Sequence, residues 1–286
     1  MADVSKAVLI TGCSTGIGRA TAERLAQNGH TVYATARRPD SIADLEEKGC
    51  KTLALDVTDE DSMAAAVSAV EQAEGAVGAL VNNAGYSQSG AIEDVPMDQV
   101  RRQFETNVFG LIRMCQLVLP GMRRQGSGRI VNLSSMGGKL VFPGGGIYHA
   151  TKHAVEAISD ALRFEVRNFG VAVSIIEPGL IKTEFAHAAV NSIDEATAEA
   201  DGSPYASFNR EVAQKTVEAY EGPMARMAAG PEAVAKVIER AITSRRPRPR
   251  YMVTAGARVL LVTRRALPDR GWDLMMRSQY PSPGTG

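Results

Sequence analysis

The stretch Thr11-Gly12-Cys13-Ser14-Thr15-Gly16-Ile17-Gly18 determines how the first half of the chain is interpreted. It continues the apolar run Ala7–Thr11, and a helical pattern starts at Gly16. The first glycine permits a tight turn, the second lets a pyrophosphate approach the backbone, and the third allows close helix–strand packing. A helix N-terminus also presents free N–H groups to phosphates. We therefore expect a dinucleotide-binding turn made by Gly12, Ser14, Thr15, Gly16, Ile17 and Gly18.

Composition and charge exclude several classes of protein. The chain has 286 residues, of which 44% are hydrophobic and 22% charged, and it carries 32 basic and 32 acidic side chains. These values are typical of a globular protein and give no sign of nucleic-acid binding. No apolar run is long enough for an integral membrane segment, and no signal peptide is recognisable. The three cysteines are widely separated, so we expect no disulfide framework and a reducing, cytoplasmic location.

Short apolar runs alternate with longer helical patterns along most of the chain. Alternation of this kind predicts an α/β fold, a Rossmann-like doubly wound parallel sheet of about seven strands with helices on both faces. No linker divides it, so residues 1–286 are interpreted as a single domain. The predicted strands are Ala7–Thr11, Thr31–Ala36, Lys51–Leu55, Ala79–Asn82, Arg129–Leu133, Val171–Ile176 and Arg250–Thr254. The predicted helices are Gly16–Asn28, Ile42–Lys48, Asp59–Glu74, Met97–Arg123, Gly146–Asn168 and Pro231–Ser244.

The last third of the chain is less regular. Residues 184–230 show only weak helical stretches, and amphipathic helices are predicted at Ala257–Ala266 and Trp272–Gln279. These terminal helices could cap a pocket, form a subunit interface, or lie on a membrane surface. The basic run Arg245–Arg250 is broken by prolines, which favours a solvated connector over a nucleic-acid or membrane contact.

A tyrosine and a lysine lie four positions apart in Tyr148-His149-Ala150-Thr151-Lys152. On a helix this spacing puts both side chains on one face. A nearby ammonium favours the phenolate, so the pair could be a proton donor tuned toward neutral pH. An ordinary surface pair has the same spacing, and the pair alone does not decide between the two.

Several further motifs occur in a fixed order between residues 7 and 183. Asn82-Asn83-Ala84-Gly85 follows the fourth predicted strand, and Ser135 precedes Tyr148 by thirteen positions. Asn107 lies in the long predicted helix, and Pro178-Gly179 precedes Thr183 by four positions. Together with the TGxxxGIG turn, these motifs resemble those of short-chain dehydrogenases/reductases (SDR), in particular compact, single-domain, NADP-preferring members.

The resemblance implies a set of site residues. It assigns catalytic roles to Asn107, Ser135, Tyr148 and Lys152, with Tyr148 as the acid or base and Lys152 lowering its pKa. Ser135 would hold the substrate oxygen, and Asn107 would anchor a water that relays protons. Beyond the glycine turn, the implied cofactor contacts are Asp56, Val57, Asn83, Ala84, Gly85, Tyr148, Lys152, Pro178, Gly179, Ile181 and Thr183.

The end of the second predicted strand bears on the choice of cofactor. NAD-preferring Rossmann proteins usually place an acidic residue there, but this chain has Arg37 and Arg38. A guanidinium can hold a 2′-phosphate with two hydrogen bonds. NADP(H) is therefore favoured, while NAD(H) remains possible.

The substrate is expected at the carboxyl ends of the strands. The resemblance places a lid at about residues 184–230 and a C-terminal extension at about 255–286. Val141, Phe142 and Phe185, with Ser135 and Tyr148, are the expected substrate contacts. The segment VYATARR and the C-terminal extension resemble those of family members that act on hydroxysteroids, retinoids or other bulky apolar carbonyl compounds, and the resemblance implies a substrate of that type. A homodimer or homotetramer is also implied.

Three alternatives remain open. The fold could serve a nucleotide-binding sensor without turnover, or a lyase, epimerase or enoyl-type reductase. It could also serve an NAD-dependent reductase of another carbonyl class, such as 3-oxoacyl thioesters. His149 and His153 lie four apart, but no third ligand accompanies them, so no metal is expected.

Overall fold

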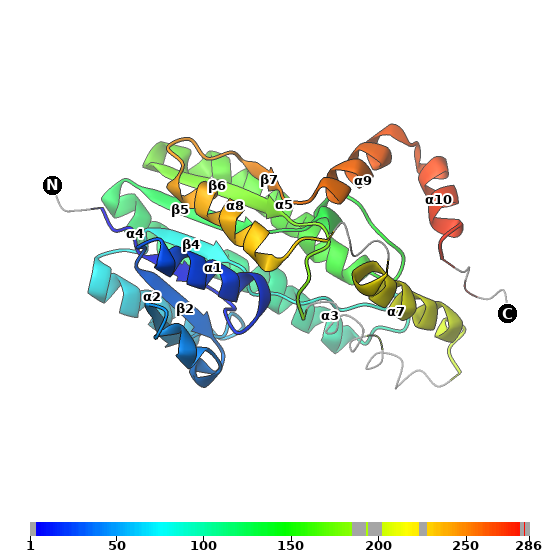
Figure 1. Cartoon of the computed structure of the whole chain (residues 1–286), viewed down its shortest axis with the longest axis horizontal. Coiled ribbons are helices and arrows are strands. Elements are labelled where there is room, and N and C mark those ends of the chain that lie inside the picture. The colour runs from blue at the N-terminus through cyan, green and yellow to red at the C-terminus, as the bar shows by residue number, and fades with distance from the viewer. Residues whose placement is uncertain (1–3, 185–192, 194–201, 223–227, 281–282, 284–286) are drawn as a thin grey trace.

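Seven parallel strands form one sheet in the order β3-β2-β1-β4-β5-β6-β7 (Figure 1). The computed structural model describes residues 4–184, 193, 202–222, 228–280 and 283. The predicted doubly wound sheet is confirmed, because every neighbouring pair is parallel and the order reverses direction at β1. The strands are β1 Val8–Ile10, β2 Val32–Ala36, β3 Cys50–Ala54, β4 Ala79–Asn82, β5 Gly128–Leu133, β6 Val171–Glu177 and β7 Arg250–Met252.

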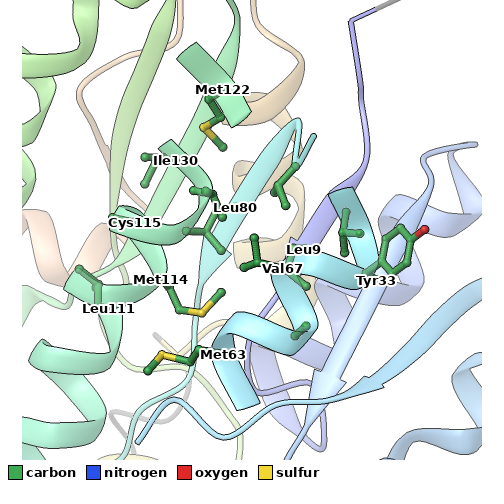
Figure 2. Close-up of a cluster of buried hydrophobic side chains, with 14 of the residues drawn as sticks. Leu9, Tyr33, Met63, Val67, Leu80, Leu111, Met114, Cys115, Met122 and Ile130 are labelled. Atoms are coloured by element: carbon green, nitrogen blue, oxygen red, sulfur yellow. The ribbon is translucent and has the colours of Figure 1, made fainter. Parts of the chain in front are cut away.

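Helices cover both faces of this sheet. Successive side chains of a strand point to opposite faces, so in β1 Leu9 joins one buried cluster while Val8 and Ile10 join the other. The cluster around Leu9 and Leu80 fills the space beneath α2, α4 and α5 (Figure 2). The helices on that face are α2 Glu60–Glu74, α4 Gly110–Gln125 and α5 Gly146–Val166, and those on the other are α1 Gly16–Gln27 and α8 Pro231–Thr243.

Local sequence signals fix the ends of several helices. The Asp59 carboxylate accepts hydrogen bonds from the N–H groups of Asp61 and Ser62, which caps the first turn of α2. Gly75 ends that helix with a φ of 82°, a backbone conformation that glycine adopts without a steric penalty. Pro231 occupies the first turn of α8, where its missing N–H costs no helical hydrogen bond.

The helix predicted at Ile42–Lys48 is wrong in kind and position. The structure has a 3₁₀ helix, η1, at Pro39–Leu45. Residues three apart share a face of a 3₁₀ helix, and Ile42 and Leu45 are both fully buried on that face. The 3₁₀ helix thus places both side chains in the core.

The helix predicted at Met97–Arg123 is interrupted in the structure. Helix α3 covers Met97–Phe104, and a π-helical turn, η2, covers Glu105–Phe109 before α4 begins. The buried Asn107 lies in this turn. Single π turns inside helices often occur at functional sites. Two further 3₁₀ turns lie at η3 Met136–Gly138 and η4 Arg167–Phe169.

The described residues after β6 include part of the expected lid. Helix α7 covers Ala206–Glu221, while Phe185 and many other residues of the expected lid lie outside the described residues. After β7 come α9 Ala255–Ala266 and α10 Asp269–Arg277, which extend away from the sheet (Figure 1). In the described part of the chain, no helix has the length and apolar character needed to cross a bilayer.

The central strand supplies a test of the fold. We expect Leu80→Ala, in fully buried β4, to lower the free energy of unfolding by about 2–5 kcal/mol, because it removes packing and leaves a cavity. Urea denaturation followed by circular dichroism measures this change. Leu274→Ala is the matched control, because Leu274 is 70% exposed and its truncation should change the value by less than about 0.5 kcal/mol. Equal losses in the two variants would contradict the assigned core.

Candidate active site

The glycine turn after β1 is built so closely that side chains do not fit. Gly12 and Gly16 have φ values of 73° and 58°. A Cβ atom on Gly12 would lie 2.9 Å from the Ala84 Cα atom, and one on Gly18 would lie 2.2 Å from the Gly12 carbonyl oxygen. Thr15 precedes α1 and its side chain makes no capping hydrogen bond. The first N–H groups of α1 are therefore available to an anion, and the turn fits a dinucleotide phosphate.

The Asn83 amide holds this turn in place. Its Nδ2 donates to the carbonyl oxygens of Thr11 and Gly12, both at 2.9 Å. The Thr11 hydroxyl accepts the N–H groups of Asn83 and Ala84, both at 3.0 Å. These hydrogen bonds join the end of β4 to the end of β1, and the Asn83 side chain stabilises the turn.

The other residues expected around a nucleotide lie at the same edge of the sheet. Arg37 and Arg38 follow β2 and are exposed, and among the described residues their guanidinium groups form no ion pair. Asp56 follows β3, where its Oδ1 accepts hydrogen bonds from the Thr58 N–H at 2.9 Å and hydroxyl at 2.8 Å. Val57 beside it is buried.

The segment after β6 returns to the glycine turn. The Pro178 carbonyl oxygen accepts the Met136 N–H at 2.9 Å. Ile181 is buried and forms a parallel bridge with Ala229. A Cβ atom on Gly16 would lie 3.2 Å from the Thr183 Cγ2 atom, so this threonine contacts the turn. Gly179 is equally confined, because its Cβ would lie 2.1 Å from the Thr254 hydroxyl oxygen.

The tyrosine–lysine pair lies in the first turns of α5, where Lys152 is buried and Tyr148 is partly exposed. The Lys152 Nζ donates to the Leu133 carbonyl oxygen at 2.8 Å and lies 5.7 Å from the centroid of the Tyr148 ring. Ser135 follows β5, and its hydroxyl forms a hydrogen bond with the Tyr148 hydroxyl. The Ser135 Oγ also accepts the Gly137 N–H at 3.0 Å. The structure thus brings Ser135, Tyr148 and Lys152 together at the ends of β5 and α5.

Asn107 joins this group through the π turn. Its Oδ1 accepts the Tyr86 N–H at 3.1 Å, and its Nδ2 donates to the Tyr86 carbonyl oxygen at 2.9 Å and to the Thr151 hydroxyl at 3.2 Å. A Cβ atom on Gly85 would lie 3.0 Å from the Asn107 Oδ1 and 3.8 Å from the Lys152 Nζ. The Asn107 amide and the Lys152 ammonium therefore both approach Gly85 from the side where a side chain would project.

Burial controls the protonation of the pair. It lowers the pKa of Lys152 from 10.5 to about 8, although the negative charge of Glu156 opposes this decrease. Burial raises the pKa of Tyr148 above its ordinary value, and the hydrogen bond with Ser135 offsets only part of that increase. This direction is opposite to the one expected from Lys152 alone, because desolvation outweighs the other influences on the phenol.

His149 has a structural role that the sequence did not reveal. Its side chain is buried, and its Nδ1 accepts the Phe142 N–H at 3.4 Å. The ring lies 5.6 Å from the Tyr148 ring and 6.0 Å from the Phe142 ring, centroid to centroid. Cβ atoms on Gly137 or Gly145 would lie 2.4 Å from it, so both glycines make room for the imidazole. The GG and GGG runs around it were the only sequence signal of this close packing.

A cavity of about 670 Å³ lies next to the start of α5. Val141, Phe142 and Gly146 form one side of it, and Trp272 of α10 lies 6.3 Å from Phe142 between ring centroids. The other lining residues are mostly apolar and include Ile92, Phe208 and Met276, with Glu93 and Asp273 as the carboxylates. Among the described residues, no cluster of histidine, cysteine and carboxylate side chains could hold a metal ion.

Comparison with known proteins shows similarity along nearly the whole chain. A model of the short chain dehydrogenase family matches residues 6–194. The chain is 35% identical over 275 residues to the uncharacterized oxidoreductase YbbO of Escherichia coli, covering 96% of this chain and 95% of that protein. It is 34% identical over 278 residues to an NADPH-dependent 3-dehydrocapnine reductase of Ornithobacterium rhinotracheale, covering 93% and 94%. It is also 41% identical over 179 residues to a 3-ketodihydrosphingosine reductase of Bacteroides thetaiotaomicron, covering 62% and 65%.

Solved structures show the same fold. A short-chain dehydrogenase from Streptomyces avermitilis is 31% identical, with 97% of each chain covered and a TM-score of 0.75. A short chain dehydrogenase/reductase from Burkholderia phymatum, in complex with NAD, is 26% identical, with 93% and 95% covered and a TM-score of 0.77.

His149 leads to a prediction about acid stability. Burial lowers its pKa from 6.5 to about 4 in the folded protein. Between pH 4 and pH 6.5 the unfolded chain binds a proton at His149 that the folded chain does not. The neutral histidine therefore contributes its full stabilisation above pH 6.5, and this contribution is lost as the pH falls toward 4. We expect a loss on the order of 2–3 kcal/mol from this group between about pH 7.5 and pH 4.5.

Urea unfolding of wild type and His149→Gln across this pH range measures the effect. The difference between their free energies of unfolding should shrink as the pH falls, because glutamine does not titrate. Parallel curves over the whole range would show that His149 is not buried in its neutral form.

Proposed function

The chain belongs to the short chain dehydrogenase family, and on this premise we propose that it interconverts a bulky apolar ketone and its secondary alcohol with NADP(H). It is an NAD(P)-dependent oxidoreductase that acts on CH–OH or carbonyl groups. The observation that carries the proposed mechanism is the convergence of Ser135, Tyr148, Lys152 and Asn107 beside the glycine turn. The individual roles below extend the family assignment to these positions.

The proposed roles follow from the positions of the side chains. A nicotinamide nucleotide, when bound at the glycine turn, supplies a hydride for reduction of the ketone or accepts one from the alcohol. Tyr148 donates its hydroxyl proton to the carbonyl oxygen during reduction and takes it back during oxidation. Ser135, already hydrogen-bonded to that hydroxyl, holds the same substrate oxygen.

Lys152 and Asn107 support the proton transfer. The ammonium of Lys152 lies near the Tyr148 ring, and a positive charge at this distance stabilises the phenolate that remains after the proton has left. Asn107 makes three hydrogen bonds, to Tyr86 and Thr151, so its amide is held rigidly beside Gly85. We propose that it orders the water through which Lys152 exchanges protons with solvent.

Substitution of the phenol tests this proposal. Tyr148→Phe should lower kcat/KM for a ketone by at least about 100-fold, since it removes the proton donor, while nucleotide binding persists. Loss of NADPH absorbance with a panel of aliphatic, cyclic and steroidal ketones measures turnover, and fluorescence titration measures binding. Tyr33→Phe is the matched control, because its hydroxyl bonds Glu74 far from the site. Tight nucleotide binding by the wild-type protein without turnover of any ketone in the panel would favour a nucleotide-binding sensor. Full activity of Tyr148→Phe would refute the role of Tyr148 as the proton donor.

The preference for NADP(H) is supported by Arg37 and Arg38. Both are exposed at the end of β2 and, within the described residues, neither is neutralised by a carboxylate. A guanidinium there is free to bind a 2′-phosphate, and no carboxylate at that end of β2 would repel it. A reductase similar over most of this chain is named as NADPH-dependent, whereas the similar Burkholderia phymatum structure contains NAD.

Cofactor titrations test this preference. Arg37→Asp should weaken NADPH binding relative to NADH by about 10- to 100-fold, since it replaces a charge-assisted hydrogen bond with repulsion. Dissociation constants for both nucleotides are measured by fluorescence at one salt concentration. Arg101→Asp, an equal charge change on an exposed residue of α3, should leave the ratio unchanged. If the ratio of the NADPH and NADH dissociation constants is unaltered in both Arg37→Asp and Arg38→Asp, neither arginine determines the cofactor preference.

The substrate class rests on the cavity beside α5. Its lining is mainly apolar, and aromatic side chains from α7, α10 and the loop before α5 contribute to it. Two similar proteins are named as reductases of 3-dehydrocapnine and 3-ketodihydrosphingosine. These features support a large apolar ketone, and they support the interpretation of α10 as part of a cap over the pocket.

An oligomeric state is also proposed. Phe109 in the π turn and Phe164 in α5 are 51% and 65% exposed. Large aromatic side chains are enriched in the buried centres of protein interfaces. Exposed phenylalanines at these two helical segments support a homodimer or homotetramer formed through them.

A further inference from the structure

Two glutamates are buried side by side behind the candidate active site. Glu156 lies on α5 and is 4% exposed, and Glu177 is the last residue of β6 and is 3% exposed. Their carboxyl groups are close enough for a hydrogen bond. Ionised carboxylates are rarely buried together, because each charge loses hydration and repels the other. The pair therefore needs a physical explanation.

Three cations and one further carboxylate form a charged cluster with the pair. The Lys139 Nζ lies 2.7 Å from the Glu156 Oε2. The Arg250 Nε lies 3.1 Å from the same oxygen and 3.3 Å from the Glu177 Oε1, and its Nη2 lies 2.6 Å from the Asp160 Oδ2. The hydrogen bond from Arg250 lowers the pKa of Asp160, which keeps that carboxyl ionised. Arg163, 3.0 Å from Asp160, is the remaining cation of this group.

The environment of the carboxyl oxygens indicates that the pair holds a proton. The Oε1 atoms of Glu156 and Glu177 are buried, and within the described part of the chain neither makes a hydrogen bond, although the Glu177 Oε1 lies 3.3 Å from the Arg250 Nε. Two carboxylates cannot bond each other, because both are acceptors, but a carboxyl group donates to a carboxylate. Burial and the neighbouring Glu156 raise the pKa of Glu177 to about 7. Glu177 is therefore the member of the pair that burial and repulsion drive to take up the shared proton.

One glutamate of the pair lies on the same helix as the active-site lysine. Glu156 follows Lys152 by one helical turn on α5, and both residues are buried. A Cβ atom on Gly138 would lie 3.0 Å from both the Glu156 Cγ and the Lys152 carbonyl oxygen, and 2.6 Å from the Ser134 Oγ. Gly138 therefore packs closely against the Glu156 side chain and the Lys152 backbone. In such surroundings a carboxylate acts strongly on a buried ammonium, and Glu156 indeed raises the pKa of Lys152.

We propose that Glu156 is the buried counter-ion that keeps Lys152 protonated, and that Glu177 keeps Glu156 ionised by carrying the proton of the pair. Both glutamates are positioning residues, since they act through Lys152 and touch neither substrate nor nucleotide. The proposal rests on the proposed function, in which Lys152 serves as a cation. Without Glu156, burial of Lys152 would favour its neutral form at the pH where the enzyme works.

Titration of Lys152 tests the proposal without measuring activity. The side-chain ε-¹³C resonance of labelled lysine should report a pKa about 1 pH unit lower in Glu156→Gln than in wild type, since a neighbouring carboxylate is removed. Glu165→Gln is the matched control, because Glu165 is an exposed residue of the same helix. Lys152→Met assigns the resonance. An unchanged titration in a folded Glu156→Gln variant would overturn the proposal.

Kinetic measurements then distinguish an effect of the Glu156 charge on Lys152 from an effect of the substitution on the structure. Glu156→Gln should reduce kcat/KM for ketone reduction about fivefold at about pH 8 and leave it unchanged at about pH 6, where Lys152 stays protonated in both proteins. A merely structural role predicts an equal loss at the two pH values, and that result would overturn the proposal. If Tyr148→Phe proves fully active, the proposed function fails, while the lysine titration still decides whether Glu156 is the counter-ion.

A measurement on the wild-type protein covers the case in which Glu156→Gln does not fold. Carboxyl ¹³C resonances of labelled glutamate should include one buried group that titrates between about pH 6 and pH 8. This transition should disappear in Glu177→Gln. Absence of any such carboxyl in the wild-type protein would refute the shared proton.

Discussion

Burial of the Lys152 ammonium is the constraint on which the candidate active site depends. A buried charge is tolerated only where hydrogen bonds and opposite charge replace its hydration. Here the Nζ donates to the Leu133 carbonyl oxygen, and Glu156 supplies the negative charge one turn away on the same helix. Strand β5 and helix α5 must therefore keep a fixed relation. Tyr148, one turn before Lys152, and Ser135, just after β5, are placed together by that same relation.

The run Asn83–Gly85 connects the two halves of the site. Its first residue bonds the carbonyl oxygens of the glycine turn, and its last residue is approached by both Asn107 and Lys152. Three consecutive positions after β4 thus contact both the expected phosphate site and the residues expected to support proton transfer. The absence of a Cβ atom at Gly18 and Gly85 permits these approaches, because a side chain at either position would collide with its neighbour.

Local signals in the sequence predicted the sheet, the glycine turn and the Tyr148–Lys152 spacing, because each depends on neighbours in the chain. The π turn around Asn107 was missed, since it is selected by hydrogen bonds to Tyr86 and to Thr151 of another helix. The close packing of His149 was missed for the same reason, although the surrounding glycines hinted at it. The proton-sharing glutamates and the contact of α10 with the loop before α5 join residues about 20 to 130 positions apart, which no periodic pattern reveals.

In the proposed mechanism the charge on Lys152 stabilises the ionised form of Tyr148 against the opposing effect of burial. Ultraviolet difference titration of tyrosinate in the NADP⁺-saturated protein measures this ionisation, with Tyr148→Phe subtracted to isolate the one phenol. Tyr148 should ionise at a lower pH in wild type than in Lys152→Met, because methionine fills a similar space without the charge. Identical titration of Tyr148 in the two proteins would show that Lys152 does not stabilise the phenolate.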